Sequence, residues 1–121
     1  MSKVNYVSED ELKEDVRILY ETNVFPERLA KNLQSMCDHI CNSHRFSGYT
    51  FDWKEEMKSQ AILTLVRFLN ERKYDNTRPN TKVFSWATKV IFLQFLCWLE
   101  KKNRKLKQEK KIQEEMKGQL Q

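Results

Sequence analysis

The chain has 121 residues and a mass of 14.7 kDa, which suits one domain with or without a tail. Only two glycines and two prolines argue against β-sandwich, collagen-like and Pro-rich classes. The net charge of +5 is uneven, because residues 1–60 hold 8 basic and 11 acidic side chains and residues 61–121 hold 14 and 6. This division predicts two partner surfaces, of which the basic one faces a polyanion.

Three features bear on the compartment. Residues 1–12 contain no apolar segment of the kind that a secretory signal needs. Three cysteines are an odd number and favour a reducing environment. The longest apolar run, Val90–Leu99, is 10 residues long and includes Gln94, whereas a bilayer span needs roughly 20 residues. We therefore expect a cytoplasmic protein without membrane contact.

Apolar residues recur at helical spacing along most of the chain, which predicts an all-α fold. Ser8 and Glu11 form a capping-box pattern, so the first helix is predicted over about 9–22. Pro26 opens a second helix, predicted to end at about 44, and Gly48 marks the sharpest turn. The predicted inward-facing residues of these helices are Leu12, Val16, Leu19, Tyr20, Leu29, Leu33, Met36 and Ile40.

The second half of the chain predicts two further helices. Asp52 and Glu55 form another capping-box pattern, so the third helix is expected to begin there and to run to about 72. A polar loop over 73–81 contains Pro79. The fourth helix is predicted to begin at residue 80 or 81 and is apolar on nearly every side up to residue 99. Such a helix is either central to the core or exposes apolar groups to a partner.

The fourth helix interleaves aromatic rings with cations. Trp86, Phe92 and Phe95 follow Lys82 and are succeeded by a basic run over 101–111. Rings stack on unpaired bases, each worth roughly 1–3 kcal/mol, while cations neutralise phosphates. The alternative is that the rings belong to the core. Because a four-helix domain can bury only one side of this helix, some of the rings are available for nucleic acid.

Metal and enzyme signatures are weak or missing. Cys37, Cys41 and His44 have a Cys-x3-Cys-x2-His spacing that suits zinc ligands, but no fourth ligand follows at the usual spacing. Both cysteines border an apolar stripe, which is typical of buried thiols. The sequence has no phosphate-cradling glycine loop and no nucleophile elbow. We expect no metal, no cofactor and no enzymatic activity.

Several segments resemble a known family. Residues 80–88 (NTKVFSWAT) resemble the KFSTYAT segment in the second conserved region of bacterial primary sigma factors. Residues 56–75 are similar to the DLIQEG…KFD segment of the same region. The strings NYV at 5–7 and FSGYT at 46–50, followed by WK and EM, resemble more closely the small late-transcription sigma factors of T-even-type bacteriophages. The resemblance spans about 5–107.

The resemblance implies a compact four-helix, sigma region 2-like domain over 1–107 with a basic C-terminal helical extension. A charged tail over 108–121 would continue as a frayed helix. One face would dock on the clamp coiled coil of the largest subunit of bacterial RNA polymerase core. The residues implied at this face are Glu55, Glu56, Ser59, Gln60 and Leu63.

The opposite edge would open an AT-rich −10-like promoter element and hold its non-template strand. The residues implied at DNA are Arg78, Lys82, Ser85, Trp86, Lys89, Phe92, Lys101, Lys102, Arg104, Lys105 and Lys107. Trp86 takes the position of the family tyrosine that stacks on the flipped −10 adenine. In the family, two tryptophans separate the strands at the edge of the transcription bubble. Lys89 and Val90 stand at those positions here, so Phe92 or Phe95 would have to act as the wedge between the strands.

We therefore expect a phage-type sigma factor that acts at the nucleoid, in the cytoplasm of a bacterial host. A phage coactivator is a further partner that the sequence leaves open. A second domain for a −35 element is not expected, because the chain leaves no room for one. Two alternatives remain: a polymerase-binding regulator that does not open promoters, and a helical adaptor whose basic tail contacts nucleic acid or anionic lipid.

Overall fold

The computed structural model describes residues 7–78 and 80–119, with side chains up to residue 116. Within these residues the chain forms α1 (Glu9–Thr22), α2 (Glu27–Cys41), a 3-10 turn η1 (His44–Phe46), α3 (Phe51–Asn70) and α4 (Val83–Gln119), and no strands. The predicted all-α fold with four packed helices is confirmed. Pro79, the start of the NYV string at Asn5 and Tyr6, and the chain end at 120–121 lie outside the described residues.

The start of α1 is as predicted and that of α3 is not. Ser8 Oγ accepts a hydrogen bond from the Glu11 amide at 3.4 Å, as the capping-box pattern predicts. At α3 the cap is Thr50, whose Oγ1 accepts from the Trp53 amide at 3.3 Å. Thr50 has the extended backbone that an N-cap requires, so the helix begins one residue before Asp52, which lies in its first turn.

The end of α2 also differs from the prediction. The helix stops at Cys41 rather than near residue 44, and the chain continues into η1. The Ser43 hydroxyl donates to the Ile40 carbonyl at 2.6 Å, which satisfies one of the free carbonyls at the helix end. Phe46 at the end of η1 is 1% exposed and so anchors the turn in the core.

Between α3 and α4 the loop is polar in sequence but partly anchored in the core. Tyr74 is only 4% exposed. The Tyr20 hydroxyl donates to the Tyr74 carbonyl at 2.8 Å, and the Tyr74 hydroxyl donates to Thr81 Oγ1 at 3.1 Å. The loop therefore extends to residue 82, and α4 begins at Val83, two or three residues later than predicted.

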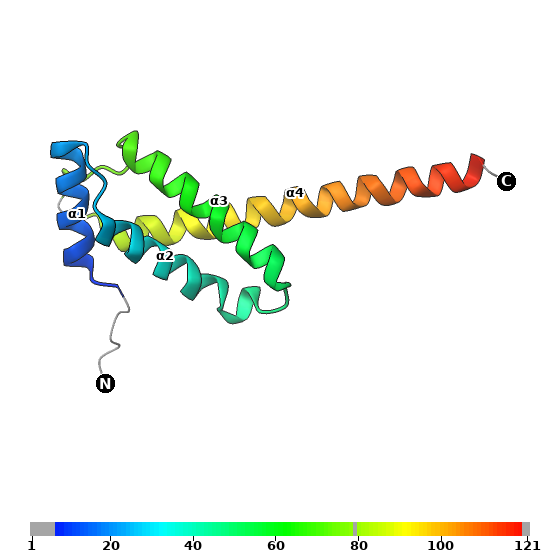
Figure 1. The fold of residues 1–121 in the computed structure, drawn as a ribbon, viewed down its shortest axis with the longest axis horizontal. Helices are drawn as coiled ribbons and strands as arrows, with labels where there is room; N and C mark the ends of the chain where they lie inside the picture. The colour runs from blue at the N-terminus through cyan, green and yellow to red at the C-terminus, as the bar shows by residue number, and fades with distance from the viewer. Residues whose placement is uncertain (1–6, 79, 120–121) are drawn as a thin grey trace.

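α4 crosses the other three helices and forms the centre of the core (Figure 1). Its core-facing residues recur at every fourth position from Val83 to Leu99. They pack against buried residues that include Leu12, Val16, Leu19, Leu29, Leu33 and Met36, as predicted, while Tyr20 and Ile40 are partly buried. Phe95 is 0% exposed, so its assignment as a wedge in DNA is wrong: the ring is enclosed by the core.

Beyond Leu99, the last buried side chain of the described residues, α4 projects away from the rest of the molecule (Figure 1). The helix continues past the predicted domain boundary at residue 107 and through the predicted tail to Gln119. An 18-residue window of α4 has a mean hydropathy of 1.3. By length and composition alone α4 thus qualifies as a membrane span, a test that core helices of soluble proteins also pass.

Candidate nucleic-acid and protein interfaces

Trp86 lies in the first turn of α4 and is partly buried. Its ring packs against Tyr74, with centroids 5.4 Å apart and ring planes inclined by 58°. Because hydrogen bonds to Tyr20 and Thr81 fix Tyr74, the indole has a rigid support on that side. The part of the indole that stays exposed is available to stack on a flat partner.

Exposed polar and cationic side chains precede and follow Trp86 in the sequence at the start of α4. Lys82, Ser85 and Lys89 are exposed, and neither lysine forms an ion pair with the described part of the chain. Arg78 is also exposed, but its Nε lies 3.2 Å from Asp75 Oδ2 in an ion pair. The two lysines are therefore the cations that this end of α4 offers to a phosphate.

Phe92 lies on another flank of α4 from Trp86. It is partly buried, its ring meets Phe46 edge-on at 5.7 Å, and the Arg45 guanidinium lies 4.5 Å from its centroid. A shallow apolar hollow of about 420 Å³ lies there, lined by Phe84, Ser85, Thr88, Lys89, Phe92 and Leu93. Trp86 and Phe92 thus contact different neighbours, and they do not form one aromatic platform.

The basic side chains of the extension divide between two sides of α4. Lys101, Lys102 and Lys105 line a groove of about 300 Å³, together with Gln94 and Trp98 of α4 and Glu56 and Gln60 of α3. Arg104 and Lys107 line a separate hollow with Glu100 and Asn103, where Arg104 pairs with Glu100 at 2.6 Å. The five predicted DNA contacts in the extension therefore do not form one surface.

Lys102 is the least exposed of these cations. Its Nζ lies 5.7 Å from the ring centroid of Trp53 and 5.9 Å from that of Trp98, within cation–π distance. The two rings meet edge-on at 5.3 Å and join α3 to α4 where α4 leaves the body of the protein. Lys102 therefore covers an aromatic contact that holds the extension in place.

The residues predicted to face the polymerase lie on one exposed side of α3. Glu55, Glu56, Ser59 and Gln60 are exposed, and Leu63 is 64% exposed, which is unusual for a large apolar side chain. Glu55 pairs with Lys58 at 3.0 Å, and the same ammonium binds Asp38 of α2 at 3.0 Å. Burial alone would lower the pKa of Lys58, but these two carboxylates outweigh it and raise that pKa. Glu55 is thus held in place.

The expectation of two opposite faces is wrong for the start of the extension. Glu56 and Gln60 share one groove with Lys101, Lys102 and Lys105. The physical reason is the packing of Trp53 on Trp98, which turns that side of α4 toward α3. The acidic and the basic surfaces therefore meet along this groove.

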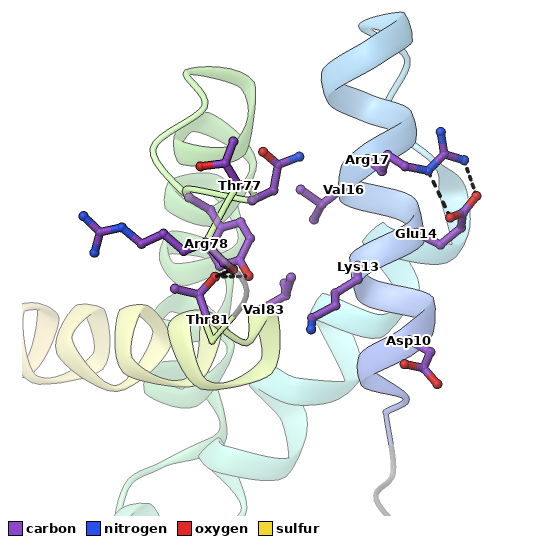
Figure 2. A pocket seen from close by; sticks show the side chains of 11 residues that line it. Asp10, Lys13, Glu14, Val16, Arg17, Thr77, Arg78, Thr81 and Val83 are labelled. Atoms are coloured by element: carbon purple, nitrogen blue, oxygen red, sulfur yellow. Dashed lines mark hydrogen bonds and ion pairs between the residues drawn. The ribbon is translucent and has the colours of Figure 1, made fainter.

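Sequence reasoning missed a polar cavity of about 360 Å³ between α1 and the loop before α4 (Figure 2). Lys13 and Val16 point toward this loop, whereas Glu14 and Arg17 pair on the far side of α1 (Figure 2). The loop is shaped by Asp75, which accepts from the Thr77 hydroxyl at 2.5 Å and the Thr77 amide at 2.9 Å. These bonds lower the pKa of Asp75. The Asp75-x-Thr77 pattern, which is typical of an Asx turn, is the feature of the sequence that indicates the shape of this loop.

Cys37 and Cys41 are buried, at 0% and 1% exposure, as their position in the stripe predicts. Burial raises the pKa of the Cys37 thiol to about 12 and also raises that of Cys41. Among the described residues, no three His, Cys, Asp or Glu side chains gather closely enough to hold a metal ion.

No protein-family model matches the chain, and no curated protein sequence matches it.

Proposed function

We propose that the protein is a phage-type sigma factor with a sigma region 2-like fold. It binds bacterial RNA polymerase core and directs initiation at promoters with an AT-rich −10-like element. The observation that supports this most is the arrangement at the start of α4, where the ring of Trp86 rests on Tyr74, and the exposed Lys82 and Lys89 precede and follow Trp86 by four and three positions. An unpaired base needs a flat apolar face, and its phosphates need cations within a few ångströms.

α3 would provide the contact with polymerase. An exposed leucine next to exposed acidic and amide groups suits a protein partner better than DNA, since acids repel phosphates. The expected partner is the clamp coiled coil of the largest subunit, with a phage coactivator as a further candidate. Glu56 would meet a basic residue of the clamp, and Leu63 would be covered by it.

Promoter opening in this proposal is driven by binding and involves no covalent step. Extruding a base costs a few kcal/mol, and one stacked base returns roughly 1–3 kcal/mol. Trp86 would hold the extruded base, while Lys82 and Lys89 would bind the adjoining phosphates. Single-stranded DNA would thus be held in preference to the duplex.

The test is run-off transcription with purified bacterial core polymerase. The template carries an AT-rich −10-like element, and a matched template has that element replaced by G·C pairs. The proposal predicts a discrete transcript from the first template only, and only when the protein is added. No transcript, although the protein binds core polymerase, would overturn the proposal.

A regulator that binds polymerase without opening promoters is the second candidate. One observation favours it. Phe92 and Phe95 were the two rings expected to replace the family's strand-separating tryptophans, and Phe95 is buried in the core. A regulator would inhibit transcription by a host holoenzyme and would give no transcript with core polymerase. The same run-off assay, with host holoenzyme added in a parallel reaction, separates the two functions.

A further inference from the structure

The apolar hollow on α4 is bounded by two rows of side chains. The members of each row are four positions apart, so each row follows one side of the helix for about two turns. The rows are Phe84, Thr88 and Phe92, and Ser85, Lys89 and Leu93. Three of these six side chains are large and apolar, and Leu93 is 52% exposed. The fold thus leaves part of this apolar surface open to solvent.

The hollow offers few hydrogen-bonding groups to a ligand. Thr88 Oγ1 is buried and has no hydrogen-bond partner among the described residues, so the exposed part of this side chain is its methyl group. The polar groups that remain are the hydroxyl of Ser85 and the ammonium of Lys89, and both side chains are exposed. The hollow therefore suits a small apolar group better than the polar edge of a base.

Cations flank the hollow, and none of the described residues that line it is acidic. Lys89 forms no ion pair with the described part of the chain. The same holds for the exposed Arg45, whose guanidinium lies 4.5 Å from the ring centroid of Phe92. An apolar hollow beside unpaired cations suits an apolar group carried by DNA, because the phosphates neutralise the cations.

Thymine is the DNA base that carries such a group. Its 5-methyl group lies in the major groove of the duplex, where apolar side chains contact it in protein–DNA complexes. Lys89 follows Trp86 by three positions and so shares a side of the helix with it. A phosphate bound at Lys89 therefore brings neighbouring bases to both Trp86 and the hollow.

We propose that the hollow binds the 5-methyl group of a thymine in the promoter element, and that Leu93 is the side chain that selects it. The inference rests on the proposed function, since it takes DNA as the ligand at the start of α4. It adds a contact that reads sequence, which stacking on Trp86 and phosphate binding do not supply. A base without the methyl group leaves Leu93 in water and is bound less tightly.

The experiment measures binding of labelled promoter DNA to the full chain in complex with bacterial core polymerase. Each thymine of the AT-rich element is replaced in turn by deoxyuridine, which keeps the base pairing and removes only the methyl group. One set of probes carries the element as duplex and another as the unpaired non-template strand, so the two sources of thymine are separated. Burial of one methyl group is worth about fourfold in affinity, so uracil at one position should weaken binding by about that factor.

Three variants locate the contact. Leu93→Ala should abolish the difference between thymine and uracil at that position, and circular dichroism checks that the variant keeps its fold. Leu106→Ala is the matched control, because Leu106 is a 45% exposed leucine of α4 outside the hollow, and it should retain the difference. Thr88→Val keeps the methyl group and removes only the buried hydroxyl, so it should also retain the difference.

Equal binding of the thymine and uracil probes at every position would overturn this inference alone, because the unsubstituted probe still binds as the proposed function requires. No binding of the unsubstituted probe would overturn both. A difference that persists in Leu93→Ala, or disappears in Thr88→Val or Leu106→Ala, would contradict the contact between Leu93 and the methyl group. Weaker binding of Leu93→Ala to core polymerase without DNA would assign the hollow to a protein partner instead.

Discussion

The ring of Trp86 is supported by Tyr74, with centroids 5.4 Å apart. Tyr74 is 4% exposed and is held by hydrogen bonds from Tyr20 and to Thr81, which come from α1 and from the loop before α4. The indole is therefore positioned before any ligand arrives. A preorganised ring loses little conformational entropy when it stacks on a base, which favours binding.

Charge reversal at Glu56 tests the α3 surface. Glu56→Lys places a cation where the proposal has a basic residue of the polymerase clamp, and like charges in an interface cost several kcal/mol. We expect co-purification with tagged core polymerase to be lost. Glu27→Lys is the control, because Glu27 is also an exposed helical acid, in the first turn of α2. Persistent binding of the Glu56 variant, or equal loss in the control, would remove Glu56 from the interface.

The division of cations around α4 predicts unequal effects on DNA binding. Arg104→Ser with Lys107→Ser removes the pair that faces away from α3 and should lower affinity for all DNA sequences. The slope of log affinity against log salt should become shallower by about 1 to 2 units. Lys101→Ser with Lys105→Ser removes two cations from the groove and should change the slope less. A larger change of the slope in Lys101→Ser with Lys105→Ser would indicate that DNA binds in the groove.

An acid on α1 caps the central helix. The amide of Phe84 donates to Glu9 Oε2 at 3.1 Å, so a carboxylate from the first turn of α1 satisfies a free amide at the start of α4. Glu9→Ala should lower the free energy of unfolding by about 0.5–2 kcal/mol, the range measured for loss of an N-cap. Urea unfolding measures this free energy. Asp10→Ala is the control, because it removes a negative charge from the same turn of α1. Equal destabilisation by both variants would assign the effect to α1 itself.

Helical periodicity predicted most of the fold, because α1 and α2 bury their stripes in a simple repeat, whereas α4 is apolar on nearly every side and its core side was not predicted. The predictions are wrong where contacts between distant parts of the chain, rather than the local sequence, determine the structure. Thr50 caps α3 in place of Asp52, and Tyr74 draws a polar loop into the core. For the same reason the pattern could not show that Phe95 is enclosed while Phe92 stays partly exposed. Nor could it show that Lys101 and Lys105 face α3 whereas Arg104 and Lys107 do not.

The buried thiol of Cys37 predicts a dependence of stability on pH. Burial raises its pKa to about 12 in the folded protein, whereas an unfolded cysteine ionises near 8.5. Below that value the thiol is protonated in both states. Above it, ionisation favours the unfolded chain, so stability falls as the pH rises toward 12. The free energy of unfolding should fall more between pH 8 and pH 10 in the wild type than in Cys37→Ala, and an equal fall would contradict this.

The most direct measurement is permanganate footprinting of an AT-rich −10-like element with core polymerase and either wild-type protein or Trp86→Ala. Permanganate oxidises unpaired thymines, so it reports strand separation itself. Phe51→Ala, which removes a 74% exposed ring at the start of α3, is the control. We predict reactive thymines with the wild type and the control, and their loss in Trp86→Ala while binding to core polymerase persists. Unchanged reactivity in Trp86→Ala would contradict the proposal that this ring holds the extruded base.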